Sequence, residues 1–421
     1  MIDGRTLCLL GLIGFVPSVE AITPSDPDKQ STVVILLDGF RWDLQTPTAT
    51  PNLERLAKAG TRGEMIPVWP TISTPNHWAL VTGLYPSHTG LFHNEMYDPE
   101  SGKYQKPLED VFFGVGEPIW AAVARQHGTS GLIGGWAGWR AADASKSPSW
   151  RMPYSIDEQG HDNRATLLLQ ILDQKAETRP DLTTLVFFDV DHEQHVYGVG
   201  SPEANQAIRH VDRVIGELTT GLAARGLDRK VNLVIVADHG MMNVGEGQVI
   251  FLDDHIDLNS LAVPPVGGGP VMALWPKPGL APVIHEKLLN AGPHLQAFRP
   301  GEIPENRKCC GSWRMPPILV TVDPGWIVTT RARSDSNVKG MHGYDHTRSE
   351  MHALFIAAGP AIRAGVQLKP FRNVDVYSLL AELLKIEPAK NDGSIDSLCP
   401  ILVHPPAACT ASPAASQDSS R

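Results

Sequence analysis

STVVILLDG, residues 31–39, decides the fold, because a continuous run of β-branched and aliphatic residues ends directly in Asp38 and Gly39. Such a run predicts a strand that is buried on both faces, as in a parallel sheet. VNLVIVADHG, residues 231–240, repeats the pattern and leads into Asp238 and His239. Ligands of α/β sheets bind beyond the carboxyl ends of the strands, so both runs bring polar side chains to the expected binding edge.

Helical and strand-like patterns alternate along the rest of the chain. Helices are expected over 51–59, 118–126, 164–177, 202–224 and 374–384, and further strands over 182–188 and 351–358. This alternation implies βαβ units, and it predicts an α/β fold with a central, mostly parallel sheet and helices on both faces. From about residue 248 to 325 the chain is rich in Pro and Gly, which predicts a small inserted cap region.

The two ends of the chain differ from this pattern. Residues 6–16 form a short apolar run after Arg5, and small residues follow near position 21, so we predict a secretory signal peptide over 1–21. The run is too short for a transmembrane span, and the protein is expected to be secreted or periplasmic. One main domain is expected over 30–403, and the Pro-, Ala- and Ser-rich residues 404–421 are expected to form a disordered tail.

Charge and cysteine content narrow the partners and the compartment. The formal net charge of −10 argues against a nucleic-acid duplex as partner, because binding a phosphate backbone requires clustered Lys and Arg. The cysteines beyond the signal peptide are Cys309, Cys310, Cys399 and Cys409. They lack the spacing of a zinc cluster, and in an exported chain they predict one or two structural disulfides whose pairing the sequence leaves open.

The segment PTISTPNHWALVTG, residues 70–83, is typical of a loop that enters a helix. We expect Thr74 to be the N-cap and Pro75 the first helical residue. Ser73 would then lie beside free backbone N–H groups and the positive end of the helix dipole, which suits a nucleophile that attacks an anionic phosphoryl group. A serine hydroxyl needs a base or a metal for this attack. Thr74 is the competing hydroxyl, and a helix cap without catalysis is the alternative interpretation.

Six acidic and imidazole side chains are expected at the same edge of the sheet. They are Asp38, Asp191, His195, Asp238, His239 and His342. Asp191 and His195 are four residues apart, which places both on one face of a helical turn. Each of the six, taken alone, is more often a solvated or loop residue. Carboxylates and imidazoles gathered near Ser73 would nevertheless suit zinc or a similar divalent ion.

A series of short motifs runs through residues 33–402. They are DGFRWD (38–43), TPNLERLAKAG (50–60), PNHW (75–78), LVTGLYPSHTG (80–90), NEMYDP (94–99), VIVADHGM (234–241), DPGW (323–326), MHGYDH (341–346) and MHALFIAAGPA (351–361). In this order they resemble the nucleotide pyrophosphatase/phosphodiesterase family of the alkaline phosphatase superfamily. The resemblance implies an alkaline-phosphatase-like fold and a phosphoric diester hydrolase or nucleotide pyrophosphatase that acts on a small-molecule phosphodiester or nucleotide.

The resemblance also implies two zinc ions and a covalent mechanism. One ion would be held by Asp191, His195 and His342, and the other by Asp38, Asp238, His239 and the oxygen of Ser73. Ser73 would attack phosphorus to give a phosphoseryl enzyme, and Asn94 would hydrogen-bond a phosphoryl oxygen. The two ions would activate the nucleophile and stabilise the oxygens of an in-line displacement.

The chain departs from the family pattern at several positions. Ser73 stands where a threonine is usual, Thr74 stands where an aromatic residue commonly stacks on a nucleotide base, and Gln194 stands where glycine is usual. Asp189 is an alternative carboxylate to Asp191. We prefer Asp191, because it has the helical spacing to the ligand histidine.

Two other functions are compatible with the sequence. Residues 73–77 also resemble the start of the sulfatase and phosphonate hydrolase signature, with His77 at its arginine position. A non-catalytic binding protein with this fold is the second alternative, although the complete set of predicted ligands argues against it. The remaining histidines are expected to be structural or to support the ligands, and His192 and His346 are the first to be reconsidered.

Overall fold

The structure is a computed structural model that describes residues 29–106, 114–141, 143–154, 156, 162–309, 311–312, 314–333 and 337–411. The predicted signal peptide and residues 412–421 of the predicted tail lie outside this part of the chain, as does Cys310. A search of the described helices finds none with the length and hydropathy that a membrane span requires.

A mixed sheet forms the centre of the molecule, in the order β18-β2-β17-β8-β1-β7-β5-β6 with β19 beside β2. Its strands are β1 (Ser31–Leu37), β2 (Thr61–Ile66), β5 (Ser130–Ile133), β6 (Trp150–Met152), β7 (Leu182–Phe187), β8 (Val231–Val236), β17 (Ala353–Ala358), β18 (Val366–Gln367) and β19 (Phe371–Arg372). β1 is parallel to both of its neighbours, β7 and β8, and every residue of β1 and β8 is buried. The predicted mostly parallel sheet is confirmed, with β17 antiparallel to β2 and β8.

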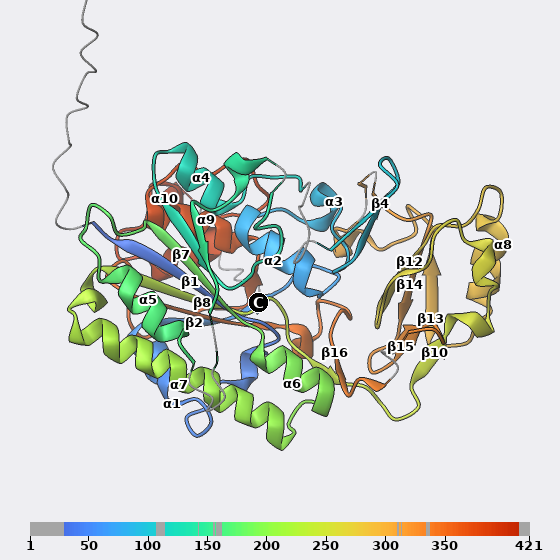
Figure 1. The fold of residues 1–421 in the computed structure, drawn as a ribbon, viewed down its shortest axis with the longest axis horizontal. Coiled ribbons are helices and arrows are strands. Elements are labelled where there is room, and N and C mark those ends of the chain that lie inside the picture. The colour runs from blue at the N-terminus through green and yellow to red at the C-terminus, as the bar shows by residue number, and fades with distance from the viewer. Residues whose placement is uncertain are drawn as a thin grey trace, which may run out of the picture.

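Helices cover both faces of this sheet, as predicted (Figure 1). One face carries α1 (Pro51–Ala59), α5 (Arg164–Leu172), α6 (Asp189–Tyr197) and α7 (Pro202–Ala224). The other carries α2 (Ser73–Thr82), α4 (Ile119–Arg125) and α9 (Asp375–Leu384). The sheet is therefore covered on both sides and leaves its strand ends as the place for a site.

Helix α7 shows how local sequence determines such an element. The hydroxyl of Ser201 accepts the backbone N–H of Ala204 at 3.1 Å, and Pro202 begins the first turn, so both start signals are present. Apolar residues then recur every three or four positions along the buried face: Ile208, Val211, Ile215, Leu218 and Leu222. This spacing packs α7 against α1, α5 and α6.

The predicted cap region forms a second, smaller sheet with its own core, on the right in Figure 1. Its antiparallel strands, in order, are β11 (Val266–Gly268), β12 (Val271–Leu274), β14 (Ile318–Val322) and β13 (Leu295–Phe298). Helix α8 (Ala281–Leu289) packs on β13, and β10 (Val249–Phe251) pairs with β15 (Ile327–Thr329). These strands are three to five residues long, which is too short for a clear periodic signal in the sequence.

The directions of the strands bring the predicted site residues to one edge. β1, β7 and β8 are parallel, so Asp38, α6 and Asp238 follow them at the same edge. β2 has the same direction, because β17 is antiparallel to both β2 and β8, and it leads through residues 67–72 into α2. The reversed β17 begins at this edge, and His342 precedes it, directly after β16 (Gly340–Met341), which pairs with β9 (Met242–Asn243).

Shorter elements complete the described chain. Helix α3 (Pro86–Thr89) and the hairpin of β3 (Met96–Asp98) and β4 (Lys103–Gln105) follow α2, and α10 (Ala408–Ala411) ends the described part. A disulfide joins Cys399 to Cys409, and Cys309 is also disulfide-bonded. The first of these disulfides ties Cys409, within the predicted tail, to the main domain, and residues 412–421 of that tail stay a prediction.

Candidate active site

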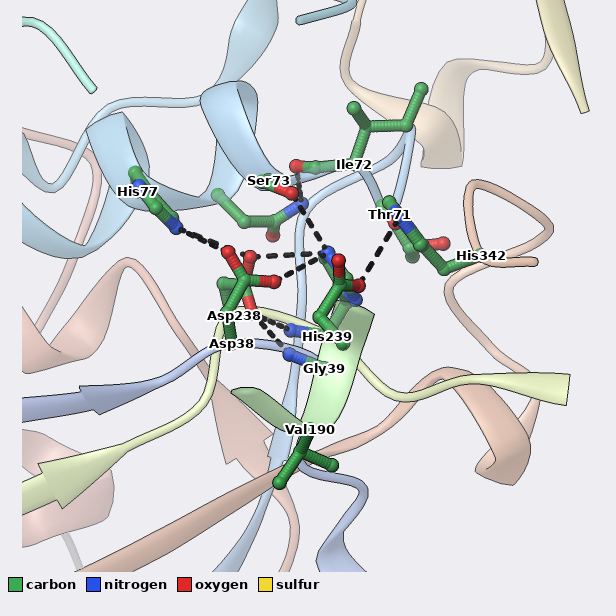
Figure 2. A network of polar contacts seen from close by, with 12 residues as sticks. Asp38, Gly39, Thr71, Ile72, Ser73, His77, Val190, Asp238, His239 and His342 are labelled. Atoms are coloured by element: carbon green, nitrogen blue, oxygen red, sulfur yellow. Dashed lines mark hydrogen bonds and ion pairs between the residues drawn. The ribbon is translucent and has the colours of Figure 1, made fainter. Parts of the chain in front are cut away.

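Two carboxylates stand side by side where β1 and β8 end. Asp38 and Asp238 are both buried, and the Oδ1 atom of Asp238 accepts the backbone N–H groups of Gly39 at 3.1 Å and His239 at 3.0 Å (Figure 2). These bonds orient Asp238 toward Asp38. Gly39 has a left-handed φ of +68°, and a Cβ there would lie 2.9 Å from the Cα of Asp191 on α6. The Asp-Gly pair after β1 therefore positions a carboxylate and also allows α6 to approach.

Helix α6 supplies Asp191 and His195, whose Oδ1 and Nε2 atoms are 3.4 Å apart. The alternative carboxylate, Asp189, is engaged elsewhere, since both of its oxygens accept N–H groups of Arg164 at 2.8 Å. Arg164 is fully buried and also pairs with Asp162. Asp162, Asp189 and His210 form a third group of possible metal ligands. The positive charge of Arg164 already pairs with both carboxylates of this group, so the group does not need a metal ion. This arrangement favours Asp191 over Asp189 as the predicted ligand.

The three predicted histidine ligands share one hydrogen-bonding pattern. In each, Nδ1 lies close to a backbone carbonyl oxygen, which can only accept, so Nδ1 carries the proton. The pairs are His195 with Gly340 at 2.8 Å, His239 with Gly240 at 3.0 Å, and His342 with Thr71 at 2.9 Å. In the neutral imidazole, each Nε2 therefore keeps a lone pair for a metal. Histidines that bind metals are commonly oriented by such an Nδ1–H bond.

The free Nε2 atoms converge with the carboxylates into two groups. Asp191, His239 and His342 place one possible donor atom each within 4.8 Å of the others, and so do Asp38, Asp238 and His239. His195 adjoins the first group, because its Nε2 is 3.1 Å from that of His342. The structure thus brings all six predicted residues together, with His239 between the two groups. Two nitrogen lone pairs at such a distance repel each other unless a cation or a proton lies near them.

Three carboxylates lie close together in this cluster, and those of Asp38 and Asp238 are buried. Within the described chain, Asp38 Oδ1, Asp191 Oδ1 and Asp238 Oδ2 are buried without a hydrogen bond, and imidazole Nε2 atoms are their ionic neighbours at 3.1–3.6 Å. Burial, together with the charges of Asp238 and Asp191, raises the pKa of Asp38 well above its ordinary value. Burial would lower the pKa of His239, but adjacent Asp238 raises it to about 9. Divalent cations would supply the missing positive charge, so the donor set fits metal ions.

Ser73 faces this cluster from the first turn of α2. Its Oγ lies 3.2 Å from Nε2 of His239 and the residue is buried. The prediction that Thr74 is the N-cap is wrong, because α2 begins at Ser73 and its N-cap, Ile72, has no capping side chain. Asn94 takes over the capping role, since its Oδ1 accepts the backbone N–H of Thr74 at 2.8 Å. The Thr74 hydroxyl is buried without a partner in the described chain, so Ser73 is the better nucleophile candidate.

Asn94 also lines a cavity of about 170 Å³ over the cluster. Because its carbonyl oxygen is engaged by Thr74, its amide NH₂ group is what it can present to a ligand. His195 and His342 line the same cavity, and Gly268 of the second sheet borders it. The space suits a phosphoryl group beside the predicted ligands.

The role of His77 was not recognised in the sequence. Its Nε2 lies 3.4 Å from Asp38 and 3.3 Å from Asp238, and its Nδ1 accepts the backbone N–H of Ala137 at 3.3 Å. Nε2 therefore carries the proton, the reverse of the three predicted ligand histidines, and this N–H faces both carboxylates (Figure 2). Its position one helical turn after Ser73 is the signal that could have identified it.

Other residues singled out in the sequence have different surroundings. His192 and His346 each line a separate cavity, and neither joins the two groups described above. Gln194, at the usual glycine position, donates its amide to the carbonyls of Gly39 and Val190 at 3.2 Å each. Gln194 therefore ties α6 to the end of β1. The residue that replaces the usual glycine has a structural role here.

Comparison with known proteins agrees with this geometry. Residues 32–345 match the family model described as type I phosphodiesterase / nucleotide pyrophosphatase. Human ectonucleotide pyrophosphatase/phosphodiesterase family member 5 is 30% identical over 392 residues, which covers 91% of this chain and 81% of the relative. Human family member 7 is 30% identical over 402 residues, with 92% and 86% covered.

A solved structure extends the comparison to the fold. An inactive threonine-to-alanine variant of murine ectonucleotide pyrophosphatase/phosphodiesterase 5, in complex with AMP, has a TM-score of 0.82 and 30% identity to this chain. The match covers 89% of this chain and 100% of that one. The fold class and the family resemblance predicted from the motifs are confirmed.

Proposed function

Because the chain belongs to the type I phosphodiesterase/nucleotide pyrophosphatase family, and is thus a hydrolase of phosphodiester or pyrophosphate bonds, we propose that it is a two-zinc enzyme with a phosphoseryl intermediate. The single observation that carries this proposal is the shared orientation of the three ligand histidines. Each bonds a backbone carbonyl through Nδ1, and each leaves Nε2 facing a buried carboxylate oxygen that has no hydrogen bond in the described chain.

The proposed ligands form two sets, each with carboxylate and imidazole donors, as zinc prefers. One set is Asp191, His195 and His342, and the other is Asp38, Asp238 and His239 with the Ser73 oxygen. When bound, the ions would lower the pKa of a coordinated hydroxyl or water and neutralise charge on the phosphoryl oxygens. His77 would keep Asp38 and Asp238 in position through its Nε2–H.

In the proposed reaction, Ser73 Oγ attacks phosphorus in line with the departing group. The new Oγ–P bond forms as the bond to the leaving oxygen breaks, which releases an alcohol or a phosphate-bearing product. Water then attacks phosphorus, the Oγ–P bond breaks, and a monophosphate leaves. The Asn94 amide and the N-terminus of α2 would donate to phosphoryl oxygens, where negative charge is concentrated.

Nucleotides are the first substrate class to consider, since the related murine protein was solved with AMP. Thr74 occupies the position where the family commonly places a base-stacking aromatic residue, and it is fully buried. We therefore propose that this chain gains little from stacking on a base at that position, and that it also accepts aryl and lipid-type diesters. A predicted signal peptide and a disulfide between Cys399 and Cys409 support a secreted or periplasmic location.

The nucleophile is tested by replacing Ser73 with alanine. Turnover of bis-p-nitrophenyl phosphate should fall on the order of 10³-fold or more, while metal analysis still finds close to two zinc ions per chain. Intact mass after rapid quenching should show one added phosphoryl group in the wild type and none in S73A. Residual activity near that of the wild type would refute the proposal. So would a wild-type mass that shows Ser73 oxidised to an aldehyde, which is the modification expected for the sulfatase-like alternative. Thr74→Ala is the matched control and should retain most activity.

A further inference from the structure

A second cavity, of about 320 Å³, lies against residues 66–69, the segment that leads from β2 toward Ser73. The turn of residues 305–308 in the cap region forms another wall, and the loop after His342 forms a third. It shares no lining residue with the cavity over the ligand cluster. Its volume is at the lower end of the range for small-molecule sites.

The charged side chains that line this cavity are basic, although Glu64, Asp345 and Asp375 lie behind three of them. Its described lining includes the cations Arg307, Lys308 and Arg372 and the imidazoles His346 and His352, and no Asp or Glu. Arg372 is held in place by Asp375, at 2.6 Å, and its Nη1 lies 3.4 Å from the Tyr85 hydroxyl. Three cationic side chains around one small space favour an anion.

Arg307 has no carboxylate partner within the described residues, and its Nη1 is buried without a hydrogen-bond acceptor there. Its guanidinium carbon lies 4.6 Å from the ring centre of Trp69 and 5.5 Å from that of Phe298. Arg307 therefore contacts both the main domain, through Trp69, and the cap region, through Phe298. Burial lowers the pKa of Arg307. A buried guanidinium N–H without an acceptor is costly, and an anion in the cavity would remove that cost.

Two further groups point to the same ligand. Lys308 ends the turn of residues 305–308 with a left-handed φ of +45°, as residues at helix ends often do, and its Nζ lies 4.4 Å from the Tyr85 ring centre. The Nδ1 atom of His346 is buried without a hydrogen bond in the described chain, and Asp345 Oδ1 lies 3.7 Å from it. The cavity therefore has one buried guanidinium nitrogen without an acceptor, with a lysine and an imidazole beside it.

We propose that this cavity is a second ligand site, separate from the zinc cluster, and that it binds a phosphate monoester. The phosphoryl oxygens would be held by Arg307 and Lys308, with Arg372 as the third charge. Trp69 and Tyr85 would contact a small organic group on the ester. Inorganic phosphate shares the phosphoryl chemistry but not the organic group, so the two can be told apart.

The test is isothermal titration of the zinc-loaded chain with phenyl phosphate and, separately, with inorganic phosphate. In Arg307→Gln and in Lys308→Gln, one binding event should weaken at least tenfold, while kcat/KM for an aryl diester without added phosphate stays within about twofold of the wild type. Arg299→Gln is the matched control, because Arg299 is an exposed cap-region arginine paired with Glu302, and it should bind both anions like the wild type.

The two probes identify the ligand class. Tighter binding of phenyl phosphate than of inorganic phosphate at the Arg307-sensitive event supports the monoester. Equal or weaker binding of phenyl phosphate overturns that assignment in favour of free phosphate. Wild-type affinities and stoichiometry in both Arg307→Gln and Lys308→Gln overturn the site itself. Lys308 is exposed, so its variant should fold even if Arg307→Gln does not.

Discussion

Replacing Gly39 with alanine tests whether the close approach of α6 to the end of β1 controls the active site. At its φ of +68°, the left-handed backbone costs alanine about 1–2 kcal/mol. The new Cβ would lie 2.9 Å from both Cα and Cβ of Asp191, compared with an ordinary contact of at least 3.4 Å. Because Cα belongs to the backbone, α6 itself must move, by about 0.5 Å, the difference between these two distances.

This displacement should be visible in catalysis. A misplacement of about 1 Å can cost about 10²-fold in rate, so moving Asp191 and His195 by half that distance should lower kcat/KM on the order of tenfold. Zinc should also be lost more readily on dialysis, since two of its proposed ligands lie on α6. The measurements are kcat/KM for bis-p-nitrophenyl phosphate, zinc per chain, and the midpoint of thermal unfolding.

Gly226 is the matched control for Gly39. It has nearly the same φ, +65°, but a Cβ there meets nothing within 4 Å. Gly226→Ala therefore adds the cost of a left-handed alanine but no close contact with another residue. It should lower the midpoint of thermal unfolding and leave kcat/KM and bound zinc unchanged. If Gly39→Ala matched Gly226→Ala in all three measurements, the approach of α6 would have no bearing on the site.

Three further changes are expected to have distinct effects. His77→Ala should lower kcat/KM by about 10–100-fold with zinc still bound, because Asp38 and Asp238 lose the N–H that faces them. His77→Gln should recover part of the lost activity, and equal kinetics in H77A and the wild type would contradict this role. His342→Ala should leave roughly one zinc per chain by metal analysis, and two full positions would argue against its assignment. Arg164→Met should reduce the free energy of unfolding in urea by about 3 kcal/mol, because Asp162 and Asp189 lose their counter-charge. The pKa of Asp162 lies below its ordinary value, so the stability that its charge contributes is present above about pH 4 and is lost as the pH falls further. R164M should therefore show a flatter dependence of unfolding free energy on pH. The same dependence as in the wild type would refute a stabilising Arg164–Asp162 ion pair.

Local pattern was sufficient for the main elements. The strand predicted over 31–37 and the helices predicted over 51–59 and 202–224 have the same bounds in the structure. Their signals are a continuous apolar run, a capping residue with proline in the first turn, and a 3.6-residue period, all contained within the segments themselves. The placement of Asp191 and His195 on one helical turn is of the same kind.

Signals that depend on distant residues were missed or misassigned. Thr74 was predicted as an N-cap, but it lies within the first turn of α2, and its own backbone N–H is accepted by Asn94, twenty residues later. The preference for Asp191 over Asp189 rested on helical spacing alone, whereas the contact of Asp189 with Arg164, on a different helix, is visible only in the structure. Nothing in the local sequence records these contacts.

The sequence by itself determined the family, the α/β class and which six side chains gather at the edge of the sheet, because motifs and strand ends are local properties. Only the tertiary structure decided the protonation of the histidines, the orienting role of His77 and the charged cavity around Arg307. Those depend on which carbonyl, carboxylate or ring lies within hydrogen-bonding distance after segments far apart in the chain have packed together.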